Sequence, residues 1–431
     1  MMTQNNVAHA MPNSSNITRT VLSNGVTVLV RANPSVKSVV LVGQMRGGSL
    51  YEASQYNGLA SMTAASLMRG TAARDLQTIA SRLEDIGADF DFAAGVHHVS
   101  FGGKALAEDL PVLIDTLSDC VMHPVFPSDQ VDRLRGEVMT WLQYSLQDTR
   151  RQAARAFRES LYDVSHPYHY SPRGTLESLP GIDAQMLKQF HASNYGPEGM
   201  TIVIVGAVDP AEAVDAVRAK LEMWAVPDQA PARSAGSAAN VERTVHTHVP
   251  IPGKTQSDVV IGVVGPERRS PDFQAARIAN SILGEFGMMG RIGDEVREKA
   301  GMAYYAYSKL EGGYGPGAWS ISAGVNPLNV ERAVDLSLQE VRKMADQLVT
   351  EAELDDNKSY FVGRMPLQLE TNEGLASAIL SMETYELGLD YLVDYPAHVN
   401  AVTADAVREA LRTYWVPDAA VVAVAGPADQ G

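Results

Sequence analysis

The chain has 431 residues, 45% of them apolar and 20% charged, which is the composition of a globular protein with room for roughly two to four domains. Its formal net charge of −16 argues against nucleic acid and anionic membrane surfaces as partners, because phosphate binding needs a basic surface. No apolar run reaches the length of a membrane span. We therefore expect neither a nucleic acid nor a membrane partner.

The cysteine usage and the N-terminal stretch indicate a cytoplasmic protein. Cys120 is the only cysteine, so no internal disulfide can form, and a lone cysteine is usually a small core residue. Residues 1–16 are mostly polar and lack the basic and apolar regions of a signal peptide. We expect these residues to be a disordered tail. A periplasmic location stays open if a leader has been removed.

The first half of the chain alternates between strand and helix patterns. Two β segments, 18–22 and 26–30, flank Ser23-Asn24-Gly25, and the Asn-Gly pair is a strong hairpin signal. A strand at 38–44 precedes an Ala-rich helix at 57–71, which Asn57 can cap and Gly70 can end. The pattern then predicts helices at 76–86, 106–121, 127–147 and 183–194, a pair of strands within 88–104 and a strand at 200–205.

An internal repeat divides the chain. One pattern consists of the helix at 183–194, an Asn-Tyr-Gly-Pro turn and a strand that ends at Gly206. The same pattern recurs as a helix from Thr403, a Tyr-Trp-Val-Pro turn and a strand that ends at Gly426. The two glycines are 426 − 206 = 220 residues apart. Residues 227–243 begin with a Pro-, Ala- and Ser-rich run and read as a linker. We expect α+β domains at 17–226 and 244–431, each a mostly antiparallel sheet with helices on one face.

The Ala-rich helix at 57–71 lacks chemically active side chains. Between Ala53 and Ala73 the sequence holds no His, Asp, Glu or Cys. These are the side chains that ligate zinc or move protons in enzymes. The simplest interpretation is that Ser61, Ala64 and Ala65 are helix-packing residues.

A block in the second half carries more chemistry. Residues 291–300 have the pattern of a helix, and Gly301 stands where a left-handed residue closes one. A strand from Met302 to Leu310 follows, and alternation places Tyr304 on the opposite face from Tyr305.

Both regions resemble the inverzincin zinc peptidases, the pitrilysin and mitochondrial processing peptidase family. Gly58-Leu59-Ala60 and Gly70-Thr71 match the frame around that family's H-x-x-E-H motif, in which two histidines hold zinc and the glutamate activates water. The resemblance places the histidines at Ser61 and Ala65, the glutamate at Ala64 and the third ligand at Leu142. Glu137 lies near that last position but needs a shift in register. Every chemical group of the zinc site is therefore replaced.

The block at 291–308 resembles the family's R-E-K-x-G-x-A-Y segment. The resemblance implies that Arg297 and Tyr304 bind a peptide carbonyl and stabilise the oxyanion that forms as water attacks. The alternatives are a solvated Arg favoured by the helix dipole and a Tyr packed in a strand. Considered together in a matching block, the two residues favour the functional interpretation.

The remaining candidate residues are weaker. The loop after this block contains Gly312, Gly313, Gly315 and Gly317, and it is either a backbone approach site for a peptide beside the cleft or a flexible hairpin turn. His166 and His169 lack an acidic partner at zinc-ligand spacing. His246 and His248 share one strand face, whereas adjacent His97 and His98 point to opposite faces.

The resemblance spans residues 18–426 and implies two similar halves arranged as a clamshell. It predicts a catalytically silent, substrate-binding subunit that binds no metal itself, pairs with a homologous zinc-bearing subunit and contributes Arg297 and Tyr304 to peptide hydrolysis. The second interpretation is a peptidase-like binding or scaffold protein without a proteolytic role. A third is a metalloenzyme built on one of the histidine pairs.

Overall fold

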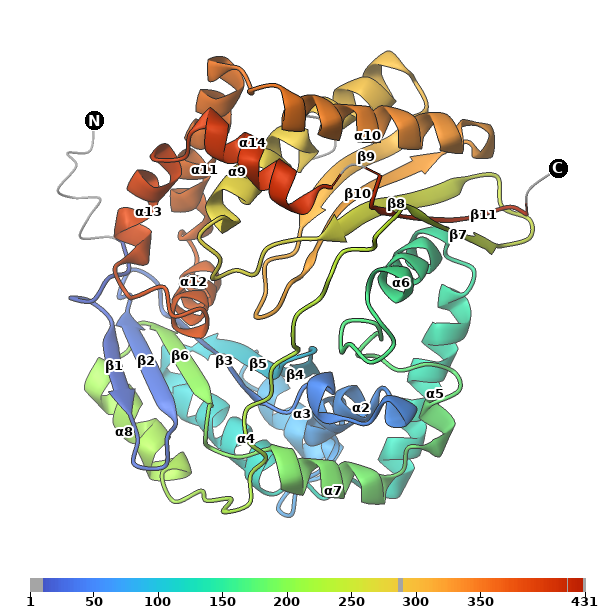
Figure 1. Cartoon of the computed structure of the whole chain (residues 1–431). Helices are drawn as coiled ribbons and strands as arrows, with labels where there is room; N and C mark the ends of the chain where they lie inside the picture. Colours follow the sequence, from blue (N-terminus) through green and yellow to red (C-terminus); the bar gives the residue numbers. More distant parts are fainter. Residues whose placement is uncertain (1–10, 286–289, 417, 429–431) are drawn as a thin grey trace. The chain divides into compact units, whose positions relative to one another are not determined.

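The computed structural model describes residues 11–285, 290–416 and 418–428 (Figure 1). The chain forms two compact units: the first contains Met1–Thr140, Ser171–Ser234 and Arg364–Tyr395, and the second contains Trp141–Tyr170, Ala235–Gly363 and Pro396–Gly431. Each unit thus draws on both sides of the linker predicted at 227–243. That linker contains no helix or strand. The predicted domain boundaries themselves stay a prediction.

The first unit is built on a six-stranded sheet with the order β1-β2-β6-β3-β5-β4. Of its pairings only β2 with β6 is parallel. The predicted hairpin is present, since the Leu22 N–H donates to the Val26 carbonyl at 2.8 Å and Gly25 adopts a φ of 93°. The strands are β1 (Thr18–Val21), β2 (Thr27–Ala32), β3 (Ser38–Arg46), β4 (Asp89–Ala94), β5 (His98–Leu106) and β6 (Thr201–Gly206).

The second unit is built on a five-stranded sheet with the order β7-β11-β8-β10-β9, in which only β7 and β11 run parallel. Its strands are β7 (Val245–Pro250), β8 (Ser257–Val264), β9 (Ala303–Leu310), β10 (Ala318–Val325) and β11 (Val421–Gly426). If β1 is left aside, both sheets have one parallel pair followed by an antiparallel series, so the internal repeat seen in the sequence is a repeat of topology.

The two glycines that mark the repeat occupy equivalent positions. Gly206 ends β6 and a Cβ added to it would lie 2.4 Å from the Ser38 carbonyl at the start of β3. Gly426 ends β11, and its Cβ would lie 2.1 Å from the Ser257 hydroxyl at the start of β8. Each glycine is required because the neighbouring strand begins against its backbone.

Each sheet is covered on one face by a helix from the other half of the sequence (Figure 1). Helix α6 (Thr149–Leu161) precedes the linker, yet it packs on β7, β8 and β11 through an apolar cluster that includes Phe157, Val260 and Ala423. Helix α12 (Asn372–Thr384) follows the linker and packs on β3 and β6, where Ile379 is fully buried. This exchange of helices explains why neither half of the sequence forms a compact unit alone.

The other helices complete the two units. In the first unit α4 (Leu110–Met122) contacts β5 and α8 (Pro210–Leu221) contacts β2, and in the second α9 (Phe273–Gly284) and α10 (Val330–Asp346) contact β9 and β10. The remaining helices are α2 (Leu59–Ser66), α3 (Leu76–Glu84), α5 (Ser128–Ser145), α7 (Ala184–Asn194), α11 (Glu351–Gln368), α13 (Tyr391–Asn400) and α14 (Ala404–Tyr414). The predicted α+β fold class is confirmed. The prediction placed helices on one face of each sheet, and the exchanged helices α6 and α12 cover the other face.

Two further features bear on the predictions. Residues 11–16 of the predicted tail form a turn, and the Ser14 N–H and hydroxyl both donate to Asp390 Oδ1, at 2.9 and 2.8 Å. Residues 1–10 of that tail lie outside the described part of the chain. None of the described helices combines the length and apolar character that a bilayer crossing requires.

Candidate functional site

The helix at the zinc-site frame is shorter than predicted. It comprises α2 and a 3₁₀ turn, Leu67–Arg69, and it ends at Gly70, whose φ is 153°. Ser61 is half-buried, Ala64 is buried and Ala65 is exposed. Ser61 and Ala65 lie one turn apart and share the more open face of the helix. That face presents a hydroxyl and a methyl group where the resemblance places histidines.

The prediction that Asn57 caps α2 is wrong. Gly58, with φ 101°, is the N-cap, and the Asn57 side chain makes no capping bond. Instead Glu52, five residues earlier, accepts hydrogen bonds from the N–H groups of Gly58 (3.0 Å) and Ala60 (2.8 Å) and from the Asn57 amide (3.0 Å). A carboxylate at a helix N-terminus satisfies its unpaired donors and complements its dipole. The sequence showed no spacing that marks such a distant cap.

The pKa of Glu52 makes the stability of this helix depend on pH. Burial raises the pKa to about 7, while the hydrogen bonds from Ala60, Gly58 and Asn57 oppose that rise. Between the ordinary value and pH 7 the folded state therefore holds a proton that the unfolded state has released, so stability falls as pH rises through this range. The shift corresponds to a loss of about 3 kcal/mol. We expect Glu52→Gln to flatten the dependence of the unfolding free energy on pH between 4.5 and 7, as measured by urea denaturation.

The acidic residue nearest the third ligand position is already paired. Glu137 accepts from Arg69 at 2.7 Å and from Arg133 at 3.1 Å. Burial works against ionisation, but the two guanidinium groups outweigh it and lower the pKa of Glu137. Leu142 is a half-buried residue of α5 and belongs to the second unit. Leu142 has no carboxylate, and the carboxylate of Glu137 is paired with two arginines.

The block of the second unit folds as a helix with a defined end. Residues Gly293–Lys299 form a π-helical turn, and Gly301, with φ 63°, closes it as predicted: its N–H donates to the Arg297 carbonyl at 3.0 Å, and the Met302 N–H donates to the Val296 carbonyl at 3.1 Å. The chain then enters β9. The π-helix is a feature that the sequence did not predict, and such turns are frequent at functional sites.

Gly301 offers a direct test of this helix end. A Cβ added to Gly301 would meet no atom within 4 Å, so Gly301→Ala changes only the cost of the left-handed conformation. We expect it to lower the free energy of unfolding by about 1 kcal/mol. Gly363 in α11 has equally open surroundings, and Gly363→Ala should raise stability by up to about 1 kcal/mol. Chemical denaturation measures both changes in unfolding free energy. If the two changes had the same sign, the left-handed helix end assigned to Gly301 would be contradicted.

Arg297 and Tyr304 lie on either side of this helix end. The Arg297 side chain is 34% exposed, and its closest acidic group is Glu298, with Nε 3.6 Å from Oε1. Tyr304 is 80% exposed at the start of β9, while Ala306 and Ser308 on the same strand face are buried. Neither the guanidinium nor the phenol hydroxyl makes a close hydrogen bond within the described residues, so both donors are available to a ligand.

The two elements that carry these residues are firmly anchored. At the start of the helix Arg291 forms a bidentate pair with Glu353, at 2.8 and 2.9 Å, and Glu353 also completes a capping box with Thr350 at the start of α11. Below β9 the buried Asn280 amide oxygen accepts from Ser308 at 2.7 Å and from Trp319 at 3.0 Å. In the sequence, the Thr-x-x-Glu spacing of a capping box marks Glu353 as a helix-start residue. No local pattern in the sequence marks Asn280.

The glycine-rich loop joins β9 to β10 and packs within its own unit. The Gly315 N–H donates to the Tyr168 hydroxyl at 3.1 Å, and Tyr162 donates to the Pro316 carbonyl at 3.0 Å. A Cβ at Gly312 would lie 2.3 Å from the Phe273 ring, and one at Gly317 would lie 2.1 Å from a backbone carbonyl. Close packing therefore accounts for glycine at these positions. A role for Gly312, Gly313, Gly315 and Gly317 in binding stays a prediction.

The histidine pairs are placed differently from one another. His166 stacks on Tyr162 and accepts from the Tyr168 N–H at 3.1 Å, while His169 Nδ1 lies 2.8 Å from the Tyr162 carbonyl oxygen, so this pair supports the loop described above. His246 and His248 share the face of β7 that borders a cavity. Within the described residues no three His, Cys, Asp or Glu side chains are grouped as metal ligands.

Comparison with known proteins identifies the family. A model described as insulinase (peptidase family M16) matches residues 27–163, and a model described as the peptidase M16 inactive domain matches residues 181–361. The chain belongs to the peptidase M16 family. The family resemblance inferred from the sequence is thereby confirmed at this level.

Several M16 relatives cover nearly the whole chain. An uncharacterized zinc protease of Streptomyces coelicolor is 26% identical over 92% of this chain and 86% of its own length, and one of Bacillus subtilis is 23% identical over 95% and 98%. A structure titled as the peptidase M16 inactive domain of Pseudomonas fluorescens has a TM-score of 0.87 at 25% identity and covers 96% of this chain and 99% of that one. A protease structure from Helicobacter pylori has a TM-score of 0.88 at 18% identity and covers 97% and 100%.

The zinc that the names of these relatives imply does not fit the residues of this chain. Zinc requires imidazole, thiolate or carboxylate ligands. At the motif positions the chain offers one hydroxyl, from Ser61, and the methyl groups of Ala64 and Ala65. Glu137, the carboxylate near the third ligand position, is held by two arginines. No catalytic step of this chain is therefore assigned to a metal of its own.

Proposed function

We propose that this chain is the non-catalytic, substrate-binding subunit of a two-chain zinc peptidase. A homologous sister subunit carries the H-x-x-E-H motif and the zinc, and this chain contributes Arg297 and Tyr304 to the bound peptide. The observation that carries the proposal is an asymmetry: the zinc-site helix has lost its chemical groups, while the second unit keeps an exposed Tyr304 and an Arg297 with only a 3.6 Å acidic neighbour.

The chemistry assigned to the two residues follows from their side chains. A guanidinium presents a rigid fork of donors, and a phenol presents one neutral donor, so both suit a peptide carbonyl oxygen that gains negative charge. Exclusion of water by a bound peptide strengthens both hydrogen bonds. The proposed setting is the cytoplasm, in keeping with the single buried Cys120.

The test is peptide hydrolysis by purified chains. This chain is assayed alone, with and without added zinc, and then mixed with an M16 chain from the same organism that carries the H-x-x-E-H motif. We expect hydrolysis only from the mixture. Hydrolysis by the lone chain would overturn the proposal.

The second candidate is a peptidase-like binding or scaffold protein. The packed glycine-rich loop favours it, because a loop held by Tyr162 and Tyr168 is less available to a substrate. Under this alternative a stable complex forms with a partner, yet replacement of Arg297 or Tyr304 leaves every measured activity of the complex unchanged.

A further inference from the structure

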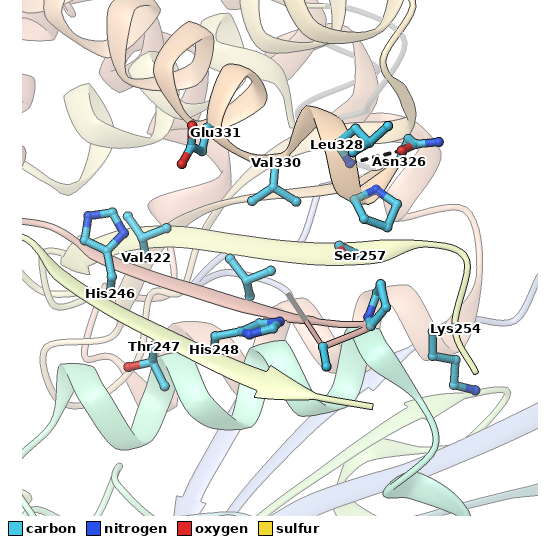
Figure 2. Close-up of a pocket in the computed structure, with 14 residues that line it drawn as sticks. His246, Thr247, His248, Lys254, Ser257, Asn326, Leu328, Val330, Glu331 and Val422 are labelled. Carbon is cyan, nitrogen blue, oxygen red and sulfur yellow. Dashed lines mark hydrogen bonds between the residues drawn. The ribbon is translucent and has the colours of Figure 1, made fainter. Parts of the chain in front are cut away.

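The second unit contains a cavity of about 610 Å³ whose lining includes neither Arg297 nor Tyr304 (Figure 2). Its floor is the face of β11 that presents Val422 and Val424, and its side is formed by the β7 residue His246. The opposite wall is the start of α10, with Val330 and the preceding Leu328. A space of this volume is within the range of sites that bury most of a ligand.

Apolar side chains line part of the cavity, beside the imidazoles of His246 and His248. Val422 is buried and Val424 is half-buried on the floor, and Leu328 at the rim is 93% exposed. An exposed leucine next to a hollow with a valine floor loses water contact only when a ligand covers it. This apolar part of the lining therefore suits an aliphatic side chain.

The two ends of the cavity carry opposite charges. Lys254 and Glu331 lie toward opposite ends of the view in Figure 2, and neither forms an ion pair or hydrogen bond with another described residue. A cation and an anion that line one cavity without pairing favour a ligand that carries both signs of charge, separated by an apolar part.

The position of β7 favours a peptide as that ligand. In the described residues β7 is the edge strand of its sheet, whereas its counterpart in the repeat, β2, is flanked by β1. The Val245 N–H donates to the Ala420 carbonyl at 3.0 Å, so the backbone groups of the next residue, His246, face away from β11. An extended segment laid along this edge places alternate side chains toward the cavity.

We propose that this cavity binds an extended peptide segment in which an aliphatic stretch separates a basic residue, placed at Glu331, from an acidic residue, placed at Lys254. The site lies within one unit and involves neither Arg297 nor Tyr304. It stands whether or not the chain serves a peptidase, and its test needs no partner subunit.

The experiment uses three fluorescein-labelled probes with the amidated sequences KVTVTD, KVTVTK and DVTVTD, and fluorescence anisotropy with the full chain. We expect the wild type to bind KVTVTD at least about fivefold more tightly than the other two, because each mismatched end costs roughly 1 kcal/mol. Lys254→Glu should shift the preference to KVTVTK, and Glu331→Lys should shift it to DVTVTD.

The control is Lys358→Glu on α11, where Lys358 contacts the Asn400 carbonyl and does not line the cavity. It should leave the preference of the wild type unchanged. Lys254 has no ion pair to lose within the described residues, so Lys254→Glu should melt as the wild type does. Glu331 lies in the first turn of α10, so Glu331→Lys should melt slightly below the wild type because it places a cation at a helix N-terminus. Equal binding of the three probes, or a preference that neither charge reversal alters, would overturn the proposal.

Discussion

Arg297→Ala in the proposed two-chain enzyme is expected to lower kcat by about 10²–10³-fold, and Tyr304→Phe is expected to lower it by a similar factor. Each substitution removes a donor that strengthens its bond as charge develops on the peptide oxygen, so the loss falls on kcat more than on KM. The Arg297 pair with Glu298 is long and partly exposed, so its removal should cost the folded chain little. Steady-state hydrolysis of a labelled peptide and a thermal melt measure the two effects.

Matched variants separate this effect from a general loss of arginine or tyrosine. Arg342 lies on α10 and forms an exposed salt bridge with Asp418. Tyr144 lies on α5 and is 77% exposed. Arg342→Ala and Tyr144→Phe should leave kcat within about twofold of the wild type. If Arg297→Ala and Tyr304→Phe behave as these controls do, the two residues have no catalytic role and the scaffold interpretation is favoured.

Asp258→Ala is expected to cause a large loss of stability, about 3–5 kcal/mol in the free energy of unfolding. Asp258 is 2% exposed on β8 and accepts hydrogen bonds from Tyr305 and from Thr149 at the start of α6. Arg150 donates to the Tyr305 hydroxyl at 3.2 Å and lies 4.0 Å from its ring centroid. Removal of the carboxylate leaves the half-buried hydroxyl donors of Thr149 and Tyr305 without this acceptor and loosens the N-terminus of the exchanged helix.

Two variants sharpen this prediction. Asp258→Asn keeps one carbonyl acceptor and should cost about half as much. Asp335 is exposed on α10, and Asp335→Ala should change stability by no more than about 0.5 kcal/mol. Urea denaturation followed by circular dichroism measures all three. A loss below about 1 kcal/mol for Asp258→Ala would show that this network does not hold α6 on its sheet.

The sequence predicted those features that local chemistry determines. The Asn-Gly hairpin, the close of the helix at Gly301 and the repeat marked by Gly206 and Gly426 all depend on a few adjacent residues, and the structure contains each of them. The alternation along β9 is likewise present, with Ala306 and Ser308 buried. These features follow from backbone geometry and strand periodicity.

The features that the sequence did not reveal depend on contacts between distant segments. Glu52 caps α2 across a turn, and Asp258 joins a strand of the second half to a helix of the first. The exchange of α6 and α12 leaves no local signal, since an amphipathic helix shows only that one face is buried and not which sheet buries it. The cavity beside β7 likewise requires the placement of α10 over β11.

The most direct test of the proposed role is zinc-dependent peptide hydrolysis by this chain alone and after it is mixed with an H-x-x-E-H-bearing sister chain. The account predicts no hydrolysis above background from the lone chain at any zinc concentration, and full activity on mixing at a ratio of one to one. Turnover by the lone chain that rises with added zinc and is abolished by a chelator would contradict it.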